Sequence, residues 1–204
     1  MYGFSLYKFV QFVFIPVLSV FYKLKVHGLE NLPSDGRIIL CSNHISNLDP
    51  VFLGMIVKRQ IFFMAKEELF RFKFFGNFLK KLGAFPVKRG KGDVSALNNA
   101  KKILSNGNIL GIFIEGTRSK TGELLKPKPG AAMLSQATAS RVIPVCIKTS
   151  NNKKVRFFSK IYISFGKVVE FSDLGLTGEN SNKCIRDASR LIMQRIAELK
   201  NEKI

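Results

Sequence analysis

The sequence lacks tryptophan and contains only two histidines and three cysteines in 204 residues. Cys41, Cys146 and Cys184 are widely spaced, form no CxxC pair and lie in apolar or helical runs, which argues against a disulfide framework or a cysteine-based metal or redox site. We expect them to be buried free thiols in a reducing compartment. Any histidine chemistry must use His27 or His44.

Acidic residues are also scarce, with 14 Asp and Glu against 33 Lys and Arg, so the net charge is +19. A positive field of this strength indicates an anionic partner, which is either nucleic acid or an anionic membrane. The 19 phenylalanines stand mainly in apolar runs and favour the membrane. A nucleic-acid-binding protein would need cations on one face with stacking aromatics or a known module, and the sequence contains no such module.

From Phe4 to Tyr22 the sequence is nearly continuously apolar, with interruptions at Lys8, Gln11 and Pro16. No small-residue cleavage pattern follows, so we interpret the segment as an uncleaved helix and not a signal peptide. About fourteen residues, from Phe9 to Tyr22, are free of charge, which is short of the roughly 20 that span a bilayer. The prediction is a membrane-associated helix over residues 1–22, lying in the interface or inserted shallowly, followed by one domain over residues 23–204.

Beyond residue 22, short strand-like runs alternate with helical ones. We expect strands over 37–42, 60–65, 85–87, 109–114, 142–148 and 155–165, and helices over 49–57, 93–105, 130–139 and 182–200. Asp49 and Pro50 suit the N-cap and N1 positions of a helix, Asp93 suits an N-cap, and Gly107 suits a left-handed helix end. This alternation predicts an α/β fold with a central, mostly buried mixed sheet flanked by helices. In such sheets the polar residues after the strands tend to form the site.

His44 follows one of the predicted strands, and Asp49 lies five residues later at the start of a helix. A carboxylate there can accept the imidazole Nδ1–H and leave Nε2 free as a general base. No serine or cysteine nucleophile is evident beside the pair, which favours direct activation of a substrate hydroxyl. On spacing alone, a loop histidine beside an ordinary Asp-Pro helix cap remains open. His27 has no carboxylate at a similar spacing and is interpreted as structural.

Two further polar segments follow strands. In one, Glu115, Gly116, Thr117 and Arg118 place a planar guanidinium suited to phosphate next to a glycine that allows close approach of a ligand. Glu115 would orient Arg118 or bind a substrate hydroxyl; the alternative is a Glu–Arg pair on a surface turn. The other segment, residues 83–91, is basic, and with Lys66 upstream it either lines a phosphate site or forms a solvated loop.

Four blocks in order carry a resemblance to a known family. They are Asn43-His44-x4-Asp49, Gly83-x-Phe-Pro-Val-x-Arg89, Phe113-x-Glu-Gly-Thr-Arg-Ser119 and Val142-Ile-Pro-Val145. Together they resemble the glycerolipid acyltransferase family, and within it the bacterial 1-acylglycerol-3-phosphate (lysophosphatidic acid) acyltransferases. One block would be a weak signal, but four in order with suitable spacing favour a functional His44–Asp49 pair over the helix-cap interpretation.

The resemblance implies a one-step transfer from an acyl thioester of acyl carrier protein or coenzyme A to the sn-2 hydroxyl of lysophosphatidic acid, giving phosphatidic acid. It implies that His44 is the base and Asp49 its support, and that Arg118, Lys66 and, more weakly, Arg89 bind the acceptor phosphate. Glu115, with Gly116 and Thr117, is expected to shape the acceptor site. No metal or other cofactor is implied. Glycerol 3-phosphate or another lysophospholipid is the alternative acceptor.

The expected location is the cytoplasmic face of the cell membrane, as a peripheral or monotopic protein. Besides the N-terminal helix, residues 69–82 suit this contact, because on one helix Phe70, Phe74, Phe78 and Leu82 share a face flanked by cations. The alternative is that this stripe packs on the core. A basic binding module without catalysis is a rival of a different class, but the intact motif residues argue against it.

Overall fold

The computed structural model describes residues 4–88, 93–150, 155–176 and 181–202. One seven-stranded sheet lies at its centre, in the order β1-β7-β6-β2-β5-β3-β4. The strands are β1 (Lys23–His27), β2 (Ile38–Ser42), β3 (Ile61–Lys66), β4 (Ala84–Val87), β5 (Ile109–Phe113), β6 (Arg141–Thr149) and β7 (Lys160–Phe165). Five neighbouring strands from β6 to β4 are parallel, whereas β7 is antiparallel to β6 and β1 is parallel to β7. The predicted mixed sheet is confirmed.

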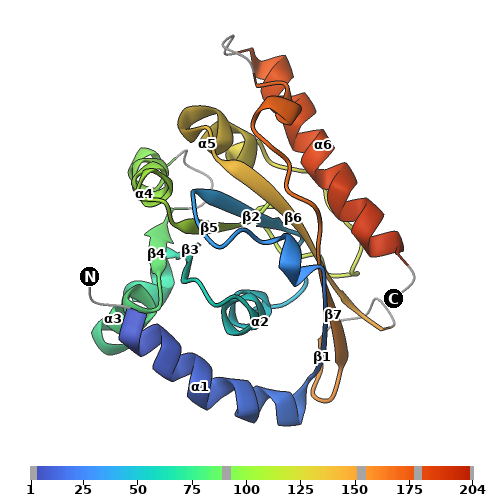
Figure 1. Ribbon diagram of the computed structural model, residues 1–204. Helices are drawn as coiled ribbons and strands as arrows, with labels where there is room; N and C mark the ends of the chain where they lie inside the picture. The colour runs from blue at the N-terminus through green and yellow to red at the C-terminus, as the bar shows by residue number, and fades with distance from the viewer. Residues whose placement is uncertain (1–3, 89–92, 151–154, 177–180, 203–204) are drawn as a thin grey trace.

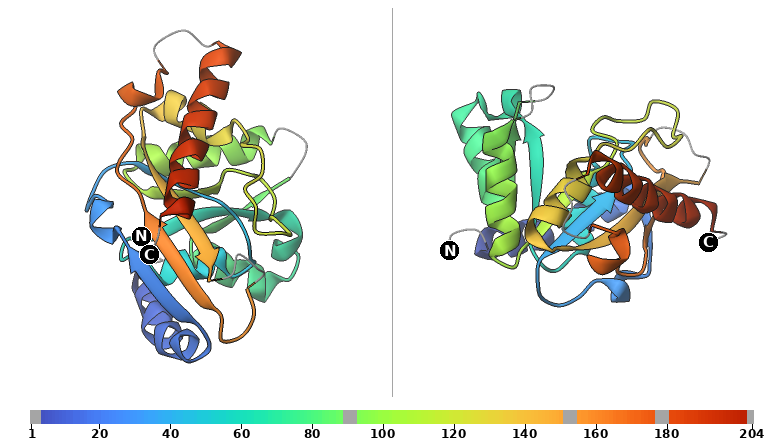
Figure 2. Two further views of the ribbon diagram at one scale, coloured as in Figure 1. Left: turned by 90° about the vertical axis from the view of Figure 1, so that its right-hand side faces the viewer. Right: turned by 90° about the horizontal axis from the view of Figure 1, so that it is seen from above.

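The helices are α1 (Phe4–Phe21), α2 (Asp49–Ile56), α3 (Lys73–Lys81), α4 (Val94–Ser105), α5 (Gly130–Thr138) and α6 (Asn182–Asn201), with short 3-10 turns η1 (Leu29–Asn31), η2 (Glu67–Phe70) and η3 (Ser172–Leu174). Helices α4, α5 and α6 cover one face of the sheet, and α1 and α2 lie on the other (Figure 1). Figure 2 shows the same layers from two more sides.

Strand β2 shows why the sheet is buried on both faces. All five of its residues are buried, and the four apolar ones alternate between two hydrophobic cores. Ile39 and Cys41 pack in the core under α4, α5 and α6, whereas Ile38 and Leu40 pack in the core that includes Phe52 of α2. A central parallel strand with helices on both sides therefore has no polar face, as its continuous apolar run predicts.

Polar side chains attach the N-terminal helix to the domain. The Tyr7 hydroxyl donates to the carbonyl of Gly54 at 2.8 Å, and Gln11 Nε2 donates to the carbonyls of Gly54 and Val57 at 2.6 and 2.9 Å. These bonds satisfy carbonyls at the C-terminal end of α2, which have no partner inside that helix. Gln11 therefore interrupts the apolar run because it faces α2. Among the helices in the described ranges, none is both long and apolar enough to cross a membrane.

The helix starts and ends that glycine and aspartate predict are present in α4. Asp93 caps its N-terminus by accepting from the backbone N–H of Ala96 at 3.0 Å. Gly107 lies just past its C-terminus with φ 75°, in the left-handed region. All three cysteines are free; Cys41 and Cys146 are buried as predicted, whereas Cys184 is only partly so.

Two predicted elements are wrong. Residues 69–82 are not one helix, because η2 ends at Phe70 and α3 begins only at Lys73, so Phe70 does not share a helix with Phe74. The last strand begins at Lys160 instead of residue 155. Residues 156–159 form a turn, closed by a bond from the Ser159 N–H to the Arg156 carbonyl at 3.1 Å. An apolar run carries no signal that separates an exposed turn from a buried strand.

Candidate active site

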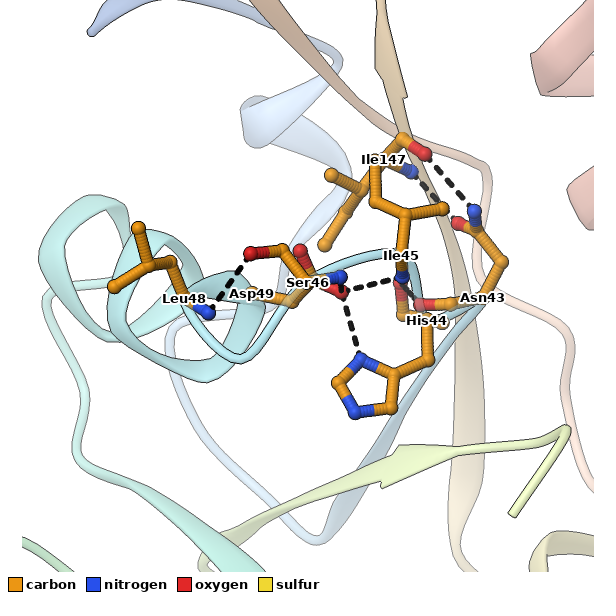
Figure 3. Close-up of polar contacts among 8 residues, drawn as sticks. Asn43, His44, Ile45, Ser46, Leu48, Asp49 and Ile147 are labelled. Carbon is orange, nitrogen blue, oxygen red and sulfur yellow. Dashed lines mark hydrogen bonds and ion pairs between the residues drawn. The ribbon is translucent and has the colours of Figure 1, made fainter. Parts of the chain in front are cut away.

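The candidate site lies where β2 and β5 end, side by side, at one edge of the parallel sheet. Asn43 fixes the chain as it leaves β2. Its Nδ2 donates to the Ile147 carbonyl at 2.9 Å, and its Oδ1 accepts from the Ile147 N–H at 2.7 Å (Figure 3). The side chain thereby continues the backbone pairing between β2 and β6 for one more step. This pairing positions the following residue, His44, and the role of Asn43 was not anticipated from the sequence.

His44 and Asp49 form the predicted contact. The His44 Nδ1 lies 2.7 Å from Asp49 Oδ2, and both residues are buried. The same oxygen accepts the backbone N–H groups of Ile45 and Ser46 at 2.7 and 2.8 Å. Three donors therefore hold the carboxylate, and it in turn fixes the proton on Nδ1. Nε2 points away from Asp49 and has no hydrogen-bond partner among the described residues (Figure 3).

Asp49 is not the N-cap that the sequence suggests. Helix α2 begins at Asp49 itself, Pro50 is its second residue, and the N-cap is Leu48, which makes no side-chain capping bond. The carboxylate turns back to the loop and accepts from Ile45 and Ser46 in place of the helix N–H groups. The prediction was wrong by one position, because the histidine loop competes successfully for this carboxylate.

An aromatic stack fixes the plane of the imidazole. The His44 ring lies against Phe113, with ring centroids 3.9 Å apart and planes inclined by 15°. Phe113 in turn stacks on Phe63, with centroids 5.8 Å apart. Gly111 makes room for Phe63, because a Cβ at that position would lie 2.1 Å from a Phe63 ring atom. The stack limits rotation of His44, and its members come from three neighbouring strands or their ends.

The loop after β5 is tied to the histidine loop by the backbone. The Ile114 N–H donates to the Ser42 carbonyl at 3.0 Å, and the Ser119 N–H donates to the His44 carbonyl at 2.8 Å. Gly116 adopts φ 69°, which a residue with a side chain rarely does. Gly116, Thr117 and Arg118 are exposed, and no other described residue forms an ion pair with the guanidinium. The unpaired guanidinium of Arg118 therefore directly precedes Ser119, which bonds to the His44 carbonyl.

Glu115 differs from its expected placement. It is 1% exposed, and it forms neither a surface pair nor a bond with Arg118. Burial raises its pKa to about 7, and the charge of Asp49 adds to the effect. Neither carboxyl oxygen has a hydrogen-bond partner among the described residues, although the N–H groups of His44 and Leu125 lie near enough to lower the pKa somewhat. Glu115 is therefore a buried carboxyl close to the His44–Asp49 pair and not an exposed group beside Arg118.

The structure describes only some of the basic residues that the sequence predicts for the site. Lys66 is exposed at the end of β3 and pairs in register with Val87 at the end of β4, so it lies at the same edge of the sheet as His44. Arg89 lies outside the described residues, as does Lys91.

His27, the other histidine, lies away from this site. It is exposed on β1, which is separated from β2 by β7 and β6 in the sheet. Among the described residues, no three His, Cys, Asp or Glu side chains are grouped to hold a metal ion.

These features define a class of site. A buried Asp–His pair with a free Nε2, at the carboxyl edge of a parallel sheet, can accept a proton from a hydroxyl and return it. Two serines lie two residues from His44 in the chain. The Ser42 hydroxyl donates to the Asn43 carbonyl at 2.9 Å, and the Ser46 hydroxyl accepts from the Leu48 N–H at 3.2 Å. The geometry thus fits general-base activation of a substrate.

Comparison with known proteins agrees with this class. The family model described as Acyltransferase matches residues 23–148. The chain is 33% identical over 199 residues to the 1-acyl-sn-glycerol-3-phosphate acyltransferase of Bacillus subtilis (strain 168), covering 97% of this chain and 98% of that one. The Borreliella burgdorferi protein of the same name is 30% identical over 173 residues, covering 81% and 69%. The chain belongs to the acyltransferase family.

A solved structure shares the fold. The crystal structure of the 1-acyl-sn-glycerophosphate (LPA) acyltransferase from Thermotoga maritima matches with a TM-score of 0.75 and 26% identity, covering 97% of this chain and 81% of that one. All four motif blocks lie within the residues that the family model matches. The protein is therefore an acyltransferase enzyme.

Proposed function

We propose that this acyltransferase moves an acyl group from a thioester of acyl carrier protein or coenzyme A to the sn-2 hydroxyl of 1-acylglycerol 3-phosphate, forming phosphatidic acid. The observation that carries the proposal is the buried His44–Asp49 pair with its unpartnered Nε2. The names of the relatives support the acceptor. Glycerol 3-phosphate or another lysophospholipid is the alternative acceptor.

The proposed reaction is a single displacement. His44 Nε2 removes the proton of the acceptor hydroxyl as the oxygen attacks the thioester carbonyl. The resulting imidazolium is stabilised by Asp49 through Nδ1. When the carbon–sulfur bond breaks, the imidazolium returns the proton to the leaving thiolate. The step needs no metal or redox cofactor, since the thioester already supplies an activated acyl group.

Cations at the edge of the sheet are proposed to hold the acceptor phosphate. Arg118 offers a planar fork to the phosphate oxygens, and Lys66 offers a compact charge. Arg89 is a weaker candidate. Gly116 and Thr117 would let the acceptor approach the loop closely, and Glu115 would support that loop from the buried side. Binding the phosphate away from the reacting hydroxyl would orient the acceptor before attack.

The enzyme is proposed to act at the cytoplasmic surface of the membrane, as a peripheral or monotopic protein. Two described elements present large apolar side chains to solvent. On α1, Phe9, Phe12 and Val20 are 63%, 79% and 69% exposed. Around α3, Phe72 and Phe74 are 76% and 96% exposed, so they do not pack on the core. Apolar faces with cationic flanks suit an anionic bilayer.

An acceptor-by-donor assay tests the proposal. Lysophosphatidic acid and glycerol 3-phosphate are each offered with acyl carrier protein and coenzyme A thioesters. We expect turnover with lysophosphatidic acid, lost in His44→Ala and retained in His27→Ala, which removes the other histidine of the chain. Substantial turnover by the His44→Ala variant would remove His44 from the mechanism. Turnover with glycerol 3-phosphate alone would reassign the acceptor.

A further inference from the structure

Two adjacent phenylalanines stand exposed at a tight turn before β7. Phe157 and Phe158 are 69% and 70% exposed, and the turn is closed by bonds between Arg156 and Ser159. Phe158 has φ 65°, a left-handed conformation that a bulky side chain rarely adopts. Glycine would fit this position without strain. A large exposed ring that is kept there at a conformational cost indicates that the ring contacts something outside the domain.

The turn is joined to the C-terminal end of α1. The Phe158 N–H donates to the Phe21 carbonyl at 2.7 Å, which gives that last-turn carbonyl a partner. The Phe157 ring meets the Phe21 ring edge-on, with centroids 5.7 Å apart, and stacks on Tyr22 at 6.2 Å. The turn therefore extends the exposed apolar face of α1 beyond the end of the helix. Figure 1 shows it beside that end, at the bottom of the view.

The charge around this surface is of one sign. Residues 1–29 and 124–169 contain no Asp or Glu, and these two segments supply α1, β1, β6, the turn and β7. Lys23 and Arg156 are exposed next to the turn, and Lys160 pairs in register with Lys23. Exposed Phe rings among cations, with no carboxylate in either segment, complement an anionic lipid surface.

We propose that Phe157 and Phe158 form a membrane-inserting tip, which enters the interface of an anionic bilayer beside the C-terminal end of α1. The inference rests on the proposed action at a membrane surface and adds to it a point of attachment at the end of α1, besides the exposed apolar side chains of α1 and the region around α3. Because the tip is bonded to α1, the two elements fix how the domain is oriented on the lipid.

The absence of tryptophan from the chain gives a direct test. Phe157→Trp places a single tryptophan at the tip, and Met133→Trp places one at a 41% exposed apolar position of α5, which lies at the opposite side of the molecule from α1 in Figure 1. Each variant is mixed with vesicles of phosphatidylcholine and phosphatidylglycerol. We expect a blue shift and quenching by brominated lipid for Phe157→Trp and neither for Met133→Trp.

Sedimentation with the vesicles separates the possible failures. If the protein co-sediments while the Phe157→Trp variant keeps the emission of a water-exposed indole, the tip is overturned and membrane action stands. If the protein does not co-sediment, both proposals fail. Emission that responds only to added cytoplasmic protein would assign the turn to a protein partner and overturn the lipid assignment.

A second pair of variants tests the energetics. Phe157→Ser combined with Phe158→Gly removes both rings and also relieves the left-handed backbone at residue 158, so the fold is retained. Vesicle partitioning should weaken by about tenfold or more, since each ring buries apolar surface. Met133→Ser should partition like the unmodified protein. Acyl transfer in detergent micelles should be unchanged in both variants, and unchanged partitioning of the double variant would contradict the tip.

Discussion

The imidazole of His44 and the carboxylate of Asp49 meet at 2.7 Å, through an oxygen that also binds the backbone N–H groups of Ile45 and Ser46. One carboxylate oxygen thus shapes the loop and orients the base. In Asp49→Asn, the amide oxygen can still accept from the backbone, but the negative charge that stabilises the imidazolium is gone. We expect kcat to fall by about 10²–10⁴-fold with the fold intact. Steady-state kinetics with circular dichroism checks this, and a kcat near that of the unmodified enzyme would contradict it.

The ring of Phe113 is predicted to act as a positioning group for His44. Phe113→Leu keeps an apolar side chain but removes the 3.9 Å stack, so the imidazole can rotate out of the orientation in which Nε2 accepts the proton. We expect kcat to fall by about tenfold, because small losses of alignment are costly, with little change in the acceptor KM. Phe63→Leu leaves the His44–Phe113 contact in place and removes only the ring behind Phe113, so it should lower kcat by less than Phe113→Leu does. A rise in the acceptor KM with unchanged kcat would instead make Phe113 a binding residue.

Glu115 should make stability depend on pH. Its pKa is raised from 4.5 to about 7, chiefly by burial. Between these two pH values the native state binds more protons than the unfolded state, so the free energy of unfolding falls as pH rises and levels off above about 7. Glu115→Gln removes this slope. The variant should gain on the order of 1–3 kcal/mol relative to the unmodified protein between about pH 4.5 and 8, measured by urea unfolding.

The exposed Glu170→Gln serves as control for that titration. It should leave the pH dependence of unfolding unchanged. A stability difference between the Glu115→Gln variant and the unmodified protein that stays constant with pH would show that Glu115 is ionised throughout this range in the native state.

Arg118 should act on the acceptor and not on the donor. Arg118→Ala removes a guanidinium that no described carboxylate pairs with, so the loop should persist. We expect the acceptor KM to rise by roughly 10–100-fold, as for loss of a charge-assisted contact to phosphate, with the donor KM little altered. Lys120→Ala, in the same loop, controls for the loss of one positive charge. Equal effects of both substitutions would indicate general electrostatic attraction in place of a specific contact.

Much of the architecture could be predicted because the local signals agree. The apolar runs at 37–42 and 109–114 match β2 and β5 to within a residue, and Asp93 and Gly107 mark both ends of α4. The same signals fail at 67–72 and 155–159, where apolar residues stand in exposed turns. Hydrophobic periodicity shows only that side chains are apolar. It cannot distinguish an apolar side chain that packs in the core from one that stays exposed on the surface of the domain.

The sequence by itself determined the motif residues, their order along the chain and the charge of the molecule. Together with the family resemblance, these were enough to predict an acyltransferase with a His–Asp pair. The tertiary structure decided which groups surround them. Only there does Asn43 pair with Ile147, does Phe113 stack on His44, and does Glu115 lie buried close to Asp49. The physical reason is that these contacts join residues on different strands, and strand order and register depend on the packing of the whole sheet.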